Sequence, residues 1–338
     1  MENQVRLSVV IPVYRSADCL AELMRQLDEE LTKIPEVTDF EVICVNDASP
    51  DPSWDVLTGL SEKYPWLVAV NLMNNVGQMK ATLCGLEQAK GDLILTMDDD
   101  IQHRPDQISK LLDQLLSRDD LDCVLGFFPQ KRHARYRNLG SRIIAWVNRH
   151  EFKLPKHLKA SSFRLMRRSV VNSILKHQTA NPDISVLSYS STSRIENVAV
   201  EHSERFAGES TYTLPKQVQL AWDNICNVSV IPLRLVTISG LLMSLFAAVM
   251  VGWVLYQYLT GVIKVPGWTT VVILLAFISG FSQLSLGILG EYVVRMLKEV
   301  QGEPRYVVRE VVRQQNMVEP MGVIKPLERQ AVETTSKK

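Results

Sequence analysis

The chain has 338 residues, of which 46% are hydrophobic, and its formal net charge is zero. This length accommodates about two domains with a sizeable core. The zero net charge excludes a global basic field of the kind that binds nucleic acid. The five cysteines are scattered and show no CxxC spacing, so we interpret them as reduced core residues of a domain that faces the cytoplasm.

Four apolar runs near the start of the chain predict buried strands, at residues 7–13, 40–46, 67–72 and 93–97. Strands that alternate with helices over about 125 residues predict an α/β fold with a mostly parallel sheet and helices on both faces. Ser16 is expected to cap the helix that follows the first run. The first run is too short for a signal peptide.

An acidic run, Asp98-Asp99-Asp100, directly follows the fourth apolar stretch. A parallel strand would deliver these carboxylates to the carboxyl edge of the sheet, where open α/β sheets bind ligands. Adjacent acids raise one another's pKa unless a cation lies among them, and their hard oxygen atoms favour Mg²⁺ or Mn²⁺. Such an ion would hold a diphosphate. The alternative is a solvated acidic turn in which an aspartate caps the next helix.

Residues 130–149 combine basic and apolar positions. Six arginines and lysines, Arg135 among them, interleave with aliphatic residues and Trp146. A basic face opposite an apolar face predicts an amphipathic helix at about residues 135–149 that lies in the interface of an anionic membrane. The alternative is an amphipathic surface helix that packs on the core of the protein.

Two long uncharged runs follow in the second half of the chain. Residues 235–259 and 265–290 contain 25 and 26 residues without a charged side chain, and about 20 suffice to cross the hydrocarbon layer of a membrane. Basic residues flank the pair on the outside, whereas the connecting loop holds only Lys264. This asymmetry predicts two transmembrane helices with both chain ends in the cytoplasm. The alternative is a pair of buried helices in a soluble protein.

These features predict four parts in chain order. Residues 1–212 would form a cytoplasmic α/β domain, 213–232 a juxtamembrane helix, 233–290 the two transmembrane helices and 291–338 a cytoplasmic tail. The tail contains a predicted edge strand at about 305–312, which is suited to pairing with another sheet or subunit. The sequence has no Walker loop, GxSxG elbow or paired Cys and His ligands.

Several short motifs occur in an order that resembles a known family. They are Ile11-Pro12-Val13-Tyr14, Asn46-Asp47-Ala48-Ser49, Asn75-Val76-Gly77-Gln78, Asp98-Asp99-Asp100-Ile101-Gln102, Phe163-Arg164-Leu165, Arg205 with Gly208-Glu209-Ser210, and Leu289-Gly290-Glu291-Tyr292. With the two uncharged runs, they resemble the polyprenyl-phosphate glycosyltransferases, inverting GT-A-type enzymes of the dolichyl-phosphate mannose synthase group. The resemblance covers about residues 5–312. It is greatest to the two-helix bacterial members that load undecaprenyl phosphate with glucose or 4-deoxy-4-formamido-arabinose.

The resemblance implies a role for each matching residue. The side chains expected to hold the nucleotide are those of Pro12, Tyr14, Asp47, Gln78, Asp98 and Asp99. Asp100 and Gln102 are expected to bind Mg²⁺ or Mn²⁺, which would bridge the diphosphate. The residues expected at the phosphates or the acceptor lipid are Arg135, Ser161, Ser162, Arg164, Arg205 and Ser210. The catalytic residues would be Asp98, Asp100 and Arg205.

The same resemblance implies the reaction and its setting. A sugar would move from a nucleotide-sugar donor to the phosphate of a membrane polyprenyl phosphate such as undecaprenyl phosphate. The donor would be linked to UDP, as is usual in the family. A phosphate monoester is already anionic at neutral pH, so no strong general base is required, and in-line attack would invert the anomeric centre. The implied location is the bacterial inner membrane, where the product would feed cell-envelope glycan or lipopolysaccharide modification. The implied assembly is a homo-oligomer such as a tetramer, with no nucleic-acid partner.

Some positions depart from the family pattern. Arg15-Ser16, Asn74 and Thr211 replace usual nucleotide or phosphate contacts, and Leu158 stands where the family carries an acid proposed as a base. These departures leave room for a non-catalytic membrane sensor of sugar nucleotides, or a scaffold. A processive polysaccharide synthase would need a Gln-x-x-Arg-Trp helix, and residues 217–222 lack the arginine. A two-span transporter is disfavoured because neither uncharged run contains an ionisable residue that would mark an ion pathway.

Overall fold

The computed structural model describes residues 4–128, 158–177, 179, 182–201, 231–260, 267–301, 304–313 and 316–319. The chain divides into two compact units. The first comprises Met1–Lys131, His157–Glu209 and Pro304–Lys338, and the second comprises Arg132–Lys156 and Ser210–Glu303. The amphipathic helix predicted at about 135–149 and nearly all of the juxtamembrane helix predicted at 213–232 lie outside the described residues.

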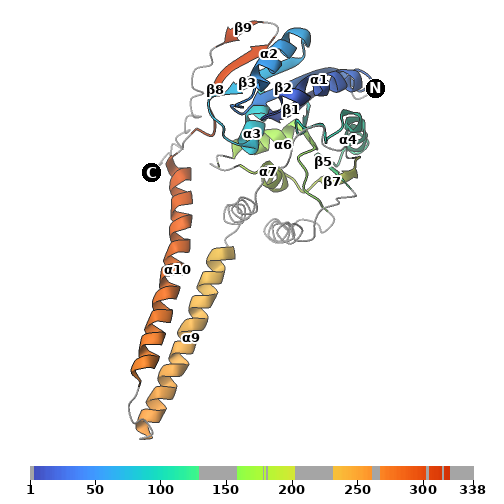
Figure 1. Ribbon diagram of the computed structural model, residues 1–338. Coiled ribbons are helices and arrows are strands. Elements are labelled where there is room, and N and C mark those ends of the chain that lie inside the picture. The colour runs from blue at the N-terminus through green and yellow to red at the C-terminus, as the bar shows by residue number, and fades with distance from the viewer. Residues whose placement is uncertain are drawn as a thin grey trace, which may run out of the picture. The chain divides into compact units, whose positions relative to one another are not determined.

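The first unit is built on a sheet that has nine strands in the described residues (Figure 1). The strands are β1 (Val5–Val13), β2 (Val37–Asn46), β3 (Leu67–Leu72), β4 (Leu93–Thr96), β5 (Cys123–Phe127), β6 (Arg164–Arg167), β7 (Ile195–Ala199), β8 (Val308–Arg313) and β9 (Asn316–Glu319). Their order across the sheet is β7-β5-β6-β4-β1-β2-β3-β8-β9. The central strands β4, β1, β2 and β3 are parallel, whereas β6 and β8 join them antiparallel. The α/β prediction is confirmed, with a mixed sheet whose centre is parallel.

Helices cover both faces of this sheet. They are α1 (Ala17–Leu31), α2 (Ser53–Lys63), α3 (Gln78–Gln88), the short 3₁₀ helix η1 (Pro105–Gln107), α4 (Ile108–Leu116), α6 (Arg168–Lys176) and α7 (Ile184–Ser191). Side chains of a strand alternate between its faces. Leu7, Val9 and Ile11 accordingly join one core cluster with α1, while Val10 lies against Gly85 of α3. β1 is therefore buried from its third residue onward, which explains its continuous apolar sequence.

Gly91, between α3 and β4, occupies a position where no side chain fits. A Cβ atom there would lie 2.7 Å from the carbonyl oxygen of Arg6 and 2.7 Å from the amide nitrogen of Ser8. We expect Gly91→Ala to lower the free energy of unfolding by about 2 kcal/mol, as overpacking does, and to lower the midpoint of thermal unfolding. Gly59→Ala in α2 is the control, because nothing lies within 4 Å of its Cβ position. Native-like melting of the Gly91 variant would contradict this close packing.

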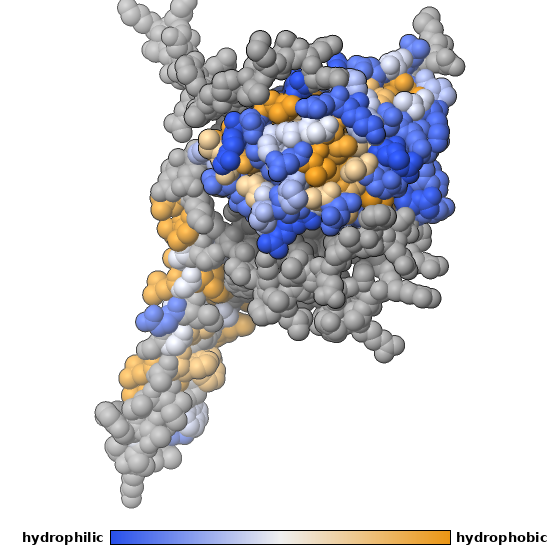
Figure 2. Space-filling model, turned by 45° about the horizontal axis from the view of Figure 1, so that its top comes forward, coloured by the Kyte–Doolittle hydropathy of each residue, from blue (hydrophilic) through white to orange (hydrophobic). Residues whose placement is uncertain are grey.

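The second unit contains two long helices, α9 (Ile231–Leu259) and α10 (Trp268–Gln301). They contact one another, since a Cβ atom at Gly240 of α9 would lie 3.8 Å from the ring of Phe281 in α10. Many large apolar side chains on both helices are exposed, and Figure 2 shows hydrophobic residues along them. Counting only residues whose placement is described, no helix is both long enough and apolar enough to cross a membrane.

Candidate functional site

Three turns at the carboxyl ends of the parallel strands β1, β2 and β4 meet at one edge of the sheet. The turn after each strand contains a non-glycine residue with a left-handed backbone: Arg15 (φ 58°), Ala48 (φ 46°) and Ile101 (φ 60°). Such conformations are uncommon for residues with a side chain, and they cluster at functional sites where the surrounding structure holds them. This edge of the sheet is therefore the candidate site.

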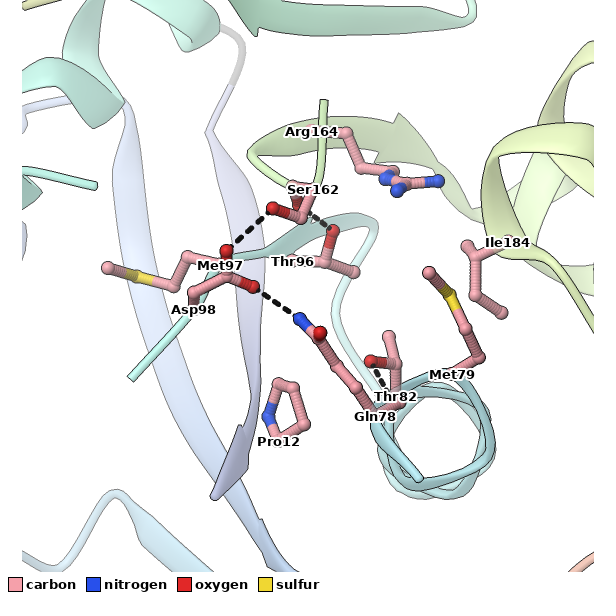
Figure 3. A pocket seen from close by; sticks show the side chains of 10 residues that line it. All are labelled: Pro12, Gln78, Met79, Thr82, Thr96, Met97, Asp98, Ser162, Arg164 and Ile184. Carbon is pink, nitrogen blue, oxygen red and sulfur yellow. Dashed lines mark hydrogen bonds between the residues drawn. The ribbon is translucent and has the colours of Figure 1, made fainter. Parts of the chain in front are cut away.

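Asp98, the first residue of the acidic run, is held by three hydrogen bonds. Its Oδ1 accepts from Nε2 of Gln78 (2.6 Å), and its Oδ2 accepts from the hydroxyl of Ser162 (2.8 Å). Its main-chain N–H donates to Nδ1 of His103 (3.0 Å). The structure thus brings together Asp98, Gln78 and Ser162, which come from three separate segments and which the sequence analysis assigned to the site (Figure 3).

His103 is a supporting residue of the site that the sequence did not reveal. It is 5% exposed, and its ring stacks on those of Phe128 and Phe163, with centroids 5.7 and 5.0 Å away. Because Nδ1 accepts the N–H of Asp98, the imidazole in this arrangement is neutral and carries its proton on Nε2. The only sequence signal was its position shortly after the acidic run.

Asp99 points toward the turn after β1. Its Oδ2 accepts hydrogen bonds from the main-chain N–H of Tyr14 (3.1 Å) and from the hydroxyl of Ser16. Burial raises the pKa of Asp99 to about 6, because desolvation outweighs these two hydrogen bonds. The prediction that the Ser16 side chain caps α1 is wrong, since it makes no cap hydrogen bond. Asp99 and Ser16 instead join the turn after β1 to the acidic run.

Asp100 and Gln102 are the residues predicted to bind a metal ion. Both are partly exposed, and the main-chain N–H of Gln102 donates to Oδ1 of Asp100 (3.2 Å). The described residues contain no group of three or more His, Cys, Asp or Glu side chains that could hold a metal. The two side chains nevertheless suit Mg²⁺, because this ion usually binds one or two carboxylates and completes its shell with water and substrate phosphates.

Asp47 fixes the turn between β3 and α3. It is 3% exposed, and its carboxylate accepts the N–H groups of Val76 (2.7 Å) and Gly77 (2.8 Å). Nδ2 of Asn75 donates to the main-chain oxygen of Asp47 (3.0 Å). Burial raises the pKa of Asp47 despite the two N–H groups. These bonds anchor the N-terminus of α3, and with it Gln78, to the end of β2.

A pocket opens beside Asp98 (Figure 3). The residues that line it are Pro12, Gln78, Met79, Thr82, Thr96, Met97, Asp98, Ser162, Arg164 and Ile184. The lining residues that were not predicted as site residues are Met79, Thr82, Thr96, Met97 and Ile184. Thr82 lies four residues after Gln78 in α3, so helical spacing alone could have placed it beside the site, whereas no local pattern pointed to Ile184.

Arg164 is a buried cation in the wall of this pocket. It is 3% exposed, and its Nη2 donates to the hydroxyl of Ser185 (3.2 Å). In the described structure its Nε and Nη1 have no hydrogen-bond partner. Desolvation lowers the pKa of Arg164. Because buried N–H groups without a partner cost free energy, this wall favours a ligand that brings anionic oxygen atoms.

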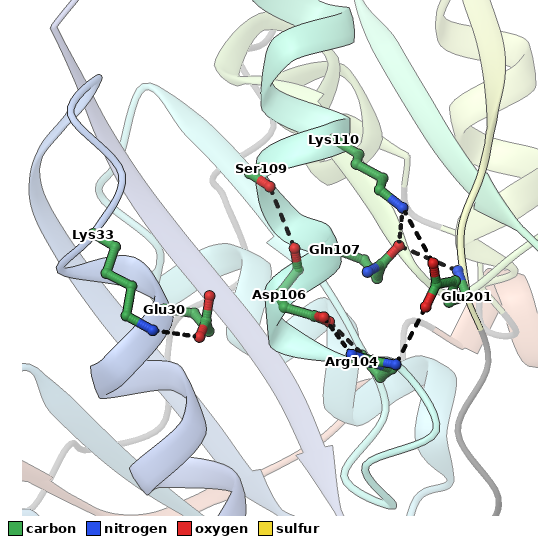
Figure 4. Close-up of polar contacts among 8 residues, drawn as sticks. All are labelled: Glu30, Lys33, Arg104, Asp106, Gln107, Ser109, Lys110 and Glu201. Carbon is green, nitrogen blue, oxygen red and sulfur yellow. Dashed lines mark hydrogen bonds and ion pairs between the residues drawn. The ribbon is translucent and has the colours of Figure 1, made fainter.

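The end of β7 is tied to the segment that follows the acidic run (Figure 4). Arg104 forms ion pairs with Asp106 and with Glu201, the latter at 3.3 Å. The main-chain N–H of Glu201 donates to Oε1 of Gln107 (3.2 Å). Nζ of Lys110 lies 3.9 Å from the carboxylate of Glu201. Glu201 is thereby anchored beside η1 and α4. The helix η1 begins three residues after Gln102, one of the predicted metal ligands.

The remaining predicted residues occupy different places. Pro12 lines the pocket, whereas Tyr14 is 44% exposed at the end of β1. The hydroxyl of Ser161 accepts the main-chain N–H of Phe163 (3.1 Å), just before β6. Three predicted phosphate or acceptor residues lie outside the described residues, namely Arg135, Arg205 and Ser210.

Fold and site define an α/β protein whose ligand edge combines carboxylates with a buried cation. Residues 8–175 match the model of Glycosyl transferase family 2. The chain is 30% identical over 318 residues to an undecaprenyl-phosphate 4-deoxy-4-formamido-L-arabinose transferase from Pseudomonas savastanoi pv. phaseolicola, with 92% of each protein covered. Proteins of the same name from Pseudomonas paraeruginosa (31% identity, 91% of this chain and 90% of that protein) and Serratia proteamaculans (30%, 92% and 95%) are similar to it. The chain belongs to glycosyl transferase family 2.

Two solved structures are similar to this chain at lower sequence identity. Mannosyl-3-phosphoglycerate synthase from Rubrobacter xylanophilus shares 16% identity with a TM-score of 0.49, covering 68% of this chain and 74% of that one. Glucosyl-3-phosphoglycerate synthase from Mycobacterium tuberculosis, in complex with Mn²⁺, UDP-glucose and phosphoglyceric acid, shares 17% with a TM-score of 0.48, covering 66% and 78%.

Proposed function

We propose that the protein transfers a sugar from a nucleotide-sugar donor to the phosphate of a membrane polyprenyl phosphate, with inversion at the anomeric carbon. The observation that carries this proposal is the pocket lined by both Asp98 and the incompletely bonded Arg164. Family membership supports sugar transfer, and the names of these relatives include undecaprenyl phosphate. Undecaprenyl phosphate is therefore the acceptor we propose here.

The donor would lie along the carboxyl edge of the sheet. Asp98, oriented by Gln78 and Ser162, would accept hydrogen bonds from the ribose or the sugar. Asp100 and Gln102 would hold Mg²⁺ or Mn²⁺, which would offset charge on the departing nucleoside diphosphate. UDP is the nucleotide we propose, and Pro12, Tyr14, Asp47 and Asp99 would form its surroundings.

The acceptor phosphate would bind at the wall formed by Arg164. The two unpaired nitrogens of this guanidinium, Nε and Nη1, would donate to phosphate oxygens, as arginine does to many phosphates. The phosphate is already anionic at neutral pH, so the task of the protein is to place one phosphate oxygen in line with the anomeric carbon. We include Ser161, Arg135, Arg205 and Ser210 among the residues that would serve this acceptor.

The lipid acceptor requires contact with a membrane, and we assign this role to α9 and α10. Their uncharged runs contain 25 and 26 residues, and side chains such as Leu241 and Leu259 are 71% and 76% exposed. Among the described residues of the first unit, by contrast, the exposed large apolar side chains are only those of Tyr14, Met73 and Met79. We propose that residues 233–290, counted over the full sequence rather than over the described side chains alone, cross the bacterial inner membrane twice and leave the α/β unit and both chain ends in the cytoplasm. The strand predicted at about 305–312 as an edge strand corresponds to β8, which pairs with β3 on one side and β9 on the other. We propose that β9, an outer strand of the sheet, would instead allow a homo-oligomer.

The test uses the full chain in lipid nanodiscs with UDP-sugars and two acceptors, a short polyprenyl phosphate and the matching polyprenyl alcohol. We expect a lipid-linked product from the phosphate alone, and a proton NMR spectrum in which the anomeric configuration of the product is opposite to that of the donor. Product from the alcohol, or retention of configuration, would contradict the proposed acceptor or the proposed mechanism, respectively.

A further inference from the structure

A row of polar side chains crosses strands β2, β3 and β8 at the carboxyl edge of the central strands. Asn46, Asn71 and Glu310 are register partners on neighbouring strands. Nδ2 of Asn46 donates to Oδ1 of Asn71 (2.9 Å), and Nδ2 of Asn71 donates to Oε1 of Glu310 (3.2 Å). Asn46 and Asn71 are 2% and 7% exposed. The carboxylate of Glu310, on a strand near the end of the chain, thus binds Asn71 on the neighbouring strand β3.

The carboxylate of Glu310 dictates the direction of this row. An ionised carboxylate only accepts hydrogen bonds, so Asn71 must turn its NH₂ group toward Glu310 and its oxygen toward Asn46. Asn46 must then donate. In the described structure the Oδ1 of Asn46 has no hydrogen-bond partner, as expected for the last member of a row that runs in one direction. One charge on β8 therefore sets the orientation of two buried amides.

The row joins the same two strand ends that Asp47 joins. Asn46 directly precedes Asp47, whose carboxylate holds the N–H groups of Val76 and Gly77 after β3. The main-chain N–H of Met73 donates to the carbonyl oxygen of Val307, just before β8 (2.9 Å). The ends of β2 and β3 and the turn into α3 are thus fixed by hydrogen bonds on both sides.

We propose that Glu310 is a positioning residue for the nucleotide. Acting through Asn71 and Asn46, it fixes the end of β2 and hence Asp47, which in turn holds the N-terminus of α3 and Gln78. The C-terminal strand β8 is therefore part of the donor site, although it follows α10 in the chain. This inference rests on the proposed function, because it concerns the nucleotide end of the same site.

The first test compares three variants of the full chain in nanodiscs. Glu310→Ala removes the acceptor of Asn71, so we expect the Kd for UDP with Mg²⁺ and the KM for the donor each to rise about tenfold, the size of one lost hydrogen bond to a charged group. We expect kcat to stay within about twofold, since the reacting groups are untouched. Glu310→Gln retains an acceptor oxygen and should stay close to the native values. Arg309→Ala, an exposed neighbour on β8, is the matched control.

A second test reverses the row. In Asn46→Asp the new carboxylate cannot donate to Asn71, so both ends of the row would offer only acceptors, and we expect UDP to bind about tenfold more weakly. In the double variant Asn46→Asp, Glu310→Gln the glutamine donates to Asn71 and Asn71 donates to the new carboxylate. We expect this variant to regain affinity to within about threefold of the native protein. If Asn46→Asp weakened UDP binding only by destabilising the whole protein, adding Glu310→Gln would not restore the affinity.

The outcomes separate this inference from the proposed function. Native protein that binds no nucleotide and transfers no sugar would overturn the proposed function, and this inference with it. Native protein that binds UDP, with Glu310→Ala binding equally well, would overturn the role of Glu310 alone. Failure of the double variant to recover would also contradict the directed row, because the hydrogen-bond chemistry predicts recovery.

Discussion

Asp100→Asn is expected to lower kcat for sugar transfer at least about 100-fold while the protein stays folded. The substitution removes a negative charge where the proposed metal ion would bind, and metal stabilisation of a leaving diphosphate contributes several kcal/mol to the transition state. The measurement is the initial rate of lipid-linked product at saturating donor, together with the midpoint of thermal unfolding. We expect the midpoint to stay close to that of the native protein, since Asp100 is only partly buried.

Asp113→Asn is the matched control for this variant. It makes the same chemical change on an exposed position of α4, so both rate and midpoint should stay at their native values. Native activity in Asp100→Asn would contradict the metal assignment. Equal loss in both variants would show instead that activity responds to net charge.

Arg164→Met is expected to weaken the use of the lipid-phosphate acceptor without lowering the stability of the protein. It removes a buried guanidinium with two nitrogens that lack partners in the described structure, and replacing an incompletely paired buried charge by an apolar side chain is often neutral or stabilising. The midpoint of thermal unfolding should therefore stay equal or rise. Loss of charge-assisted hydrogen bonds to the phosphate should lower kcat/KM for polyprenyl phosphate roughly 10- to 100-fold, with little change in UDP binding.

Arg167→Met, on the same strand, should behave in the opposite way. The guanidinium of Arg167 donates to the carbonyl oxygens of Leu121 (2.7 Å) and Leu115 (3.3 Å), so its removal leaves buried acceptors unpaired and should lower the midpoint. Normal acceptor kinetics in Arg164→Met, or a selective acceptor defect in Arg167→Met, would contradict the assignment of the phosphate to Arg164.

The central strands could be predicted because local sequence determines them. The apolar run at Leu67–Leu72 coincides with β3, and the run predicted at 40–46 lies within β2 (Val37–Asn46), whose second and third residues, Thr38 and Asp39, are polar and exposed. The antiparallel insertion of β6 between β4 and β5 could not be predicted. It depends on pairing between segments that lie far apart in the chain, and a four-residue strand carries little periodicity of its own.

In the candidate site, too, some residues could be predicted from the sequence and others could not. Asp98 could be predicted because the carboxyl ends of parallel strands gather at one edge, and Gln78 and Ser162, assigned by family resemblance, do contact it. The unpaired state of Arg164 could not be predicted, because it depends on which groups fail to reach the guanidinium. The contact between Asn71 and Glu310 spans a separation of 239 residues, so no local pattern indicates it.

The most direct test of the proposed transferase is incorporation of radiolabelled sugar into undecaprenyl phosphate. Membranes that contain the protein would receive a panel of nucleotide sugars with Mg²⁺, Mn²⁺ or EDTA, and lipid-linked product would be extracted with chloroform. We predict product from one donor, formed with a divalent cation and abolished by EDTA and by Asp100→Asn. Intact nucleotide binding without product from any donor would contradict sugar transfer and favour a sensor of sugar nucleotides.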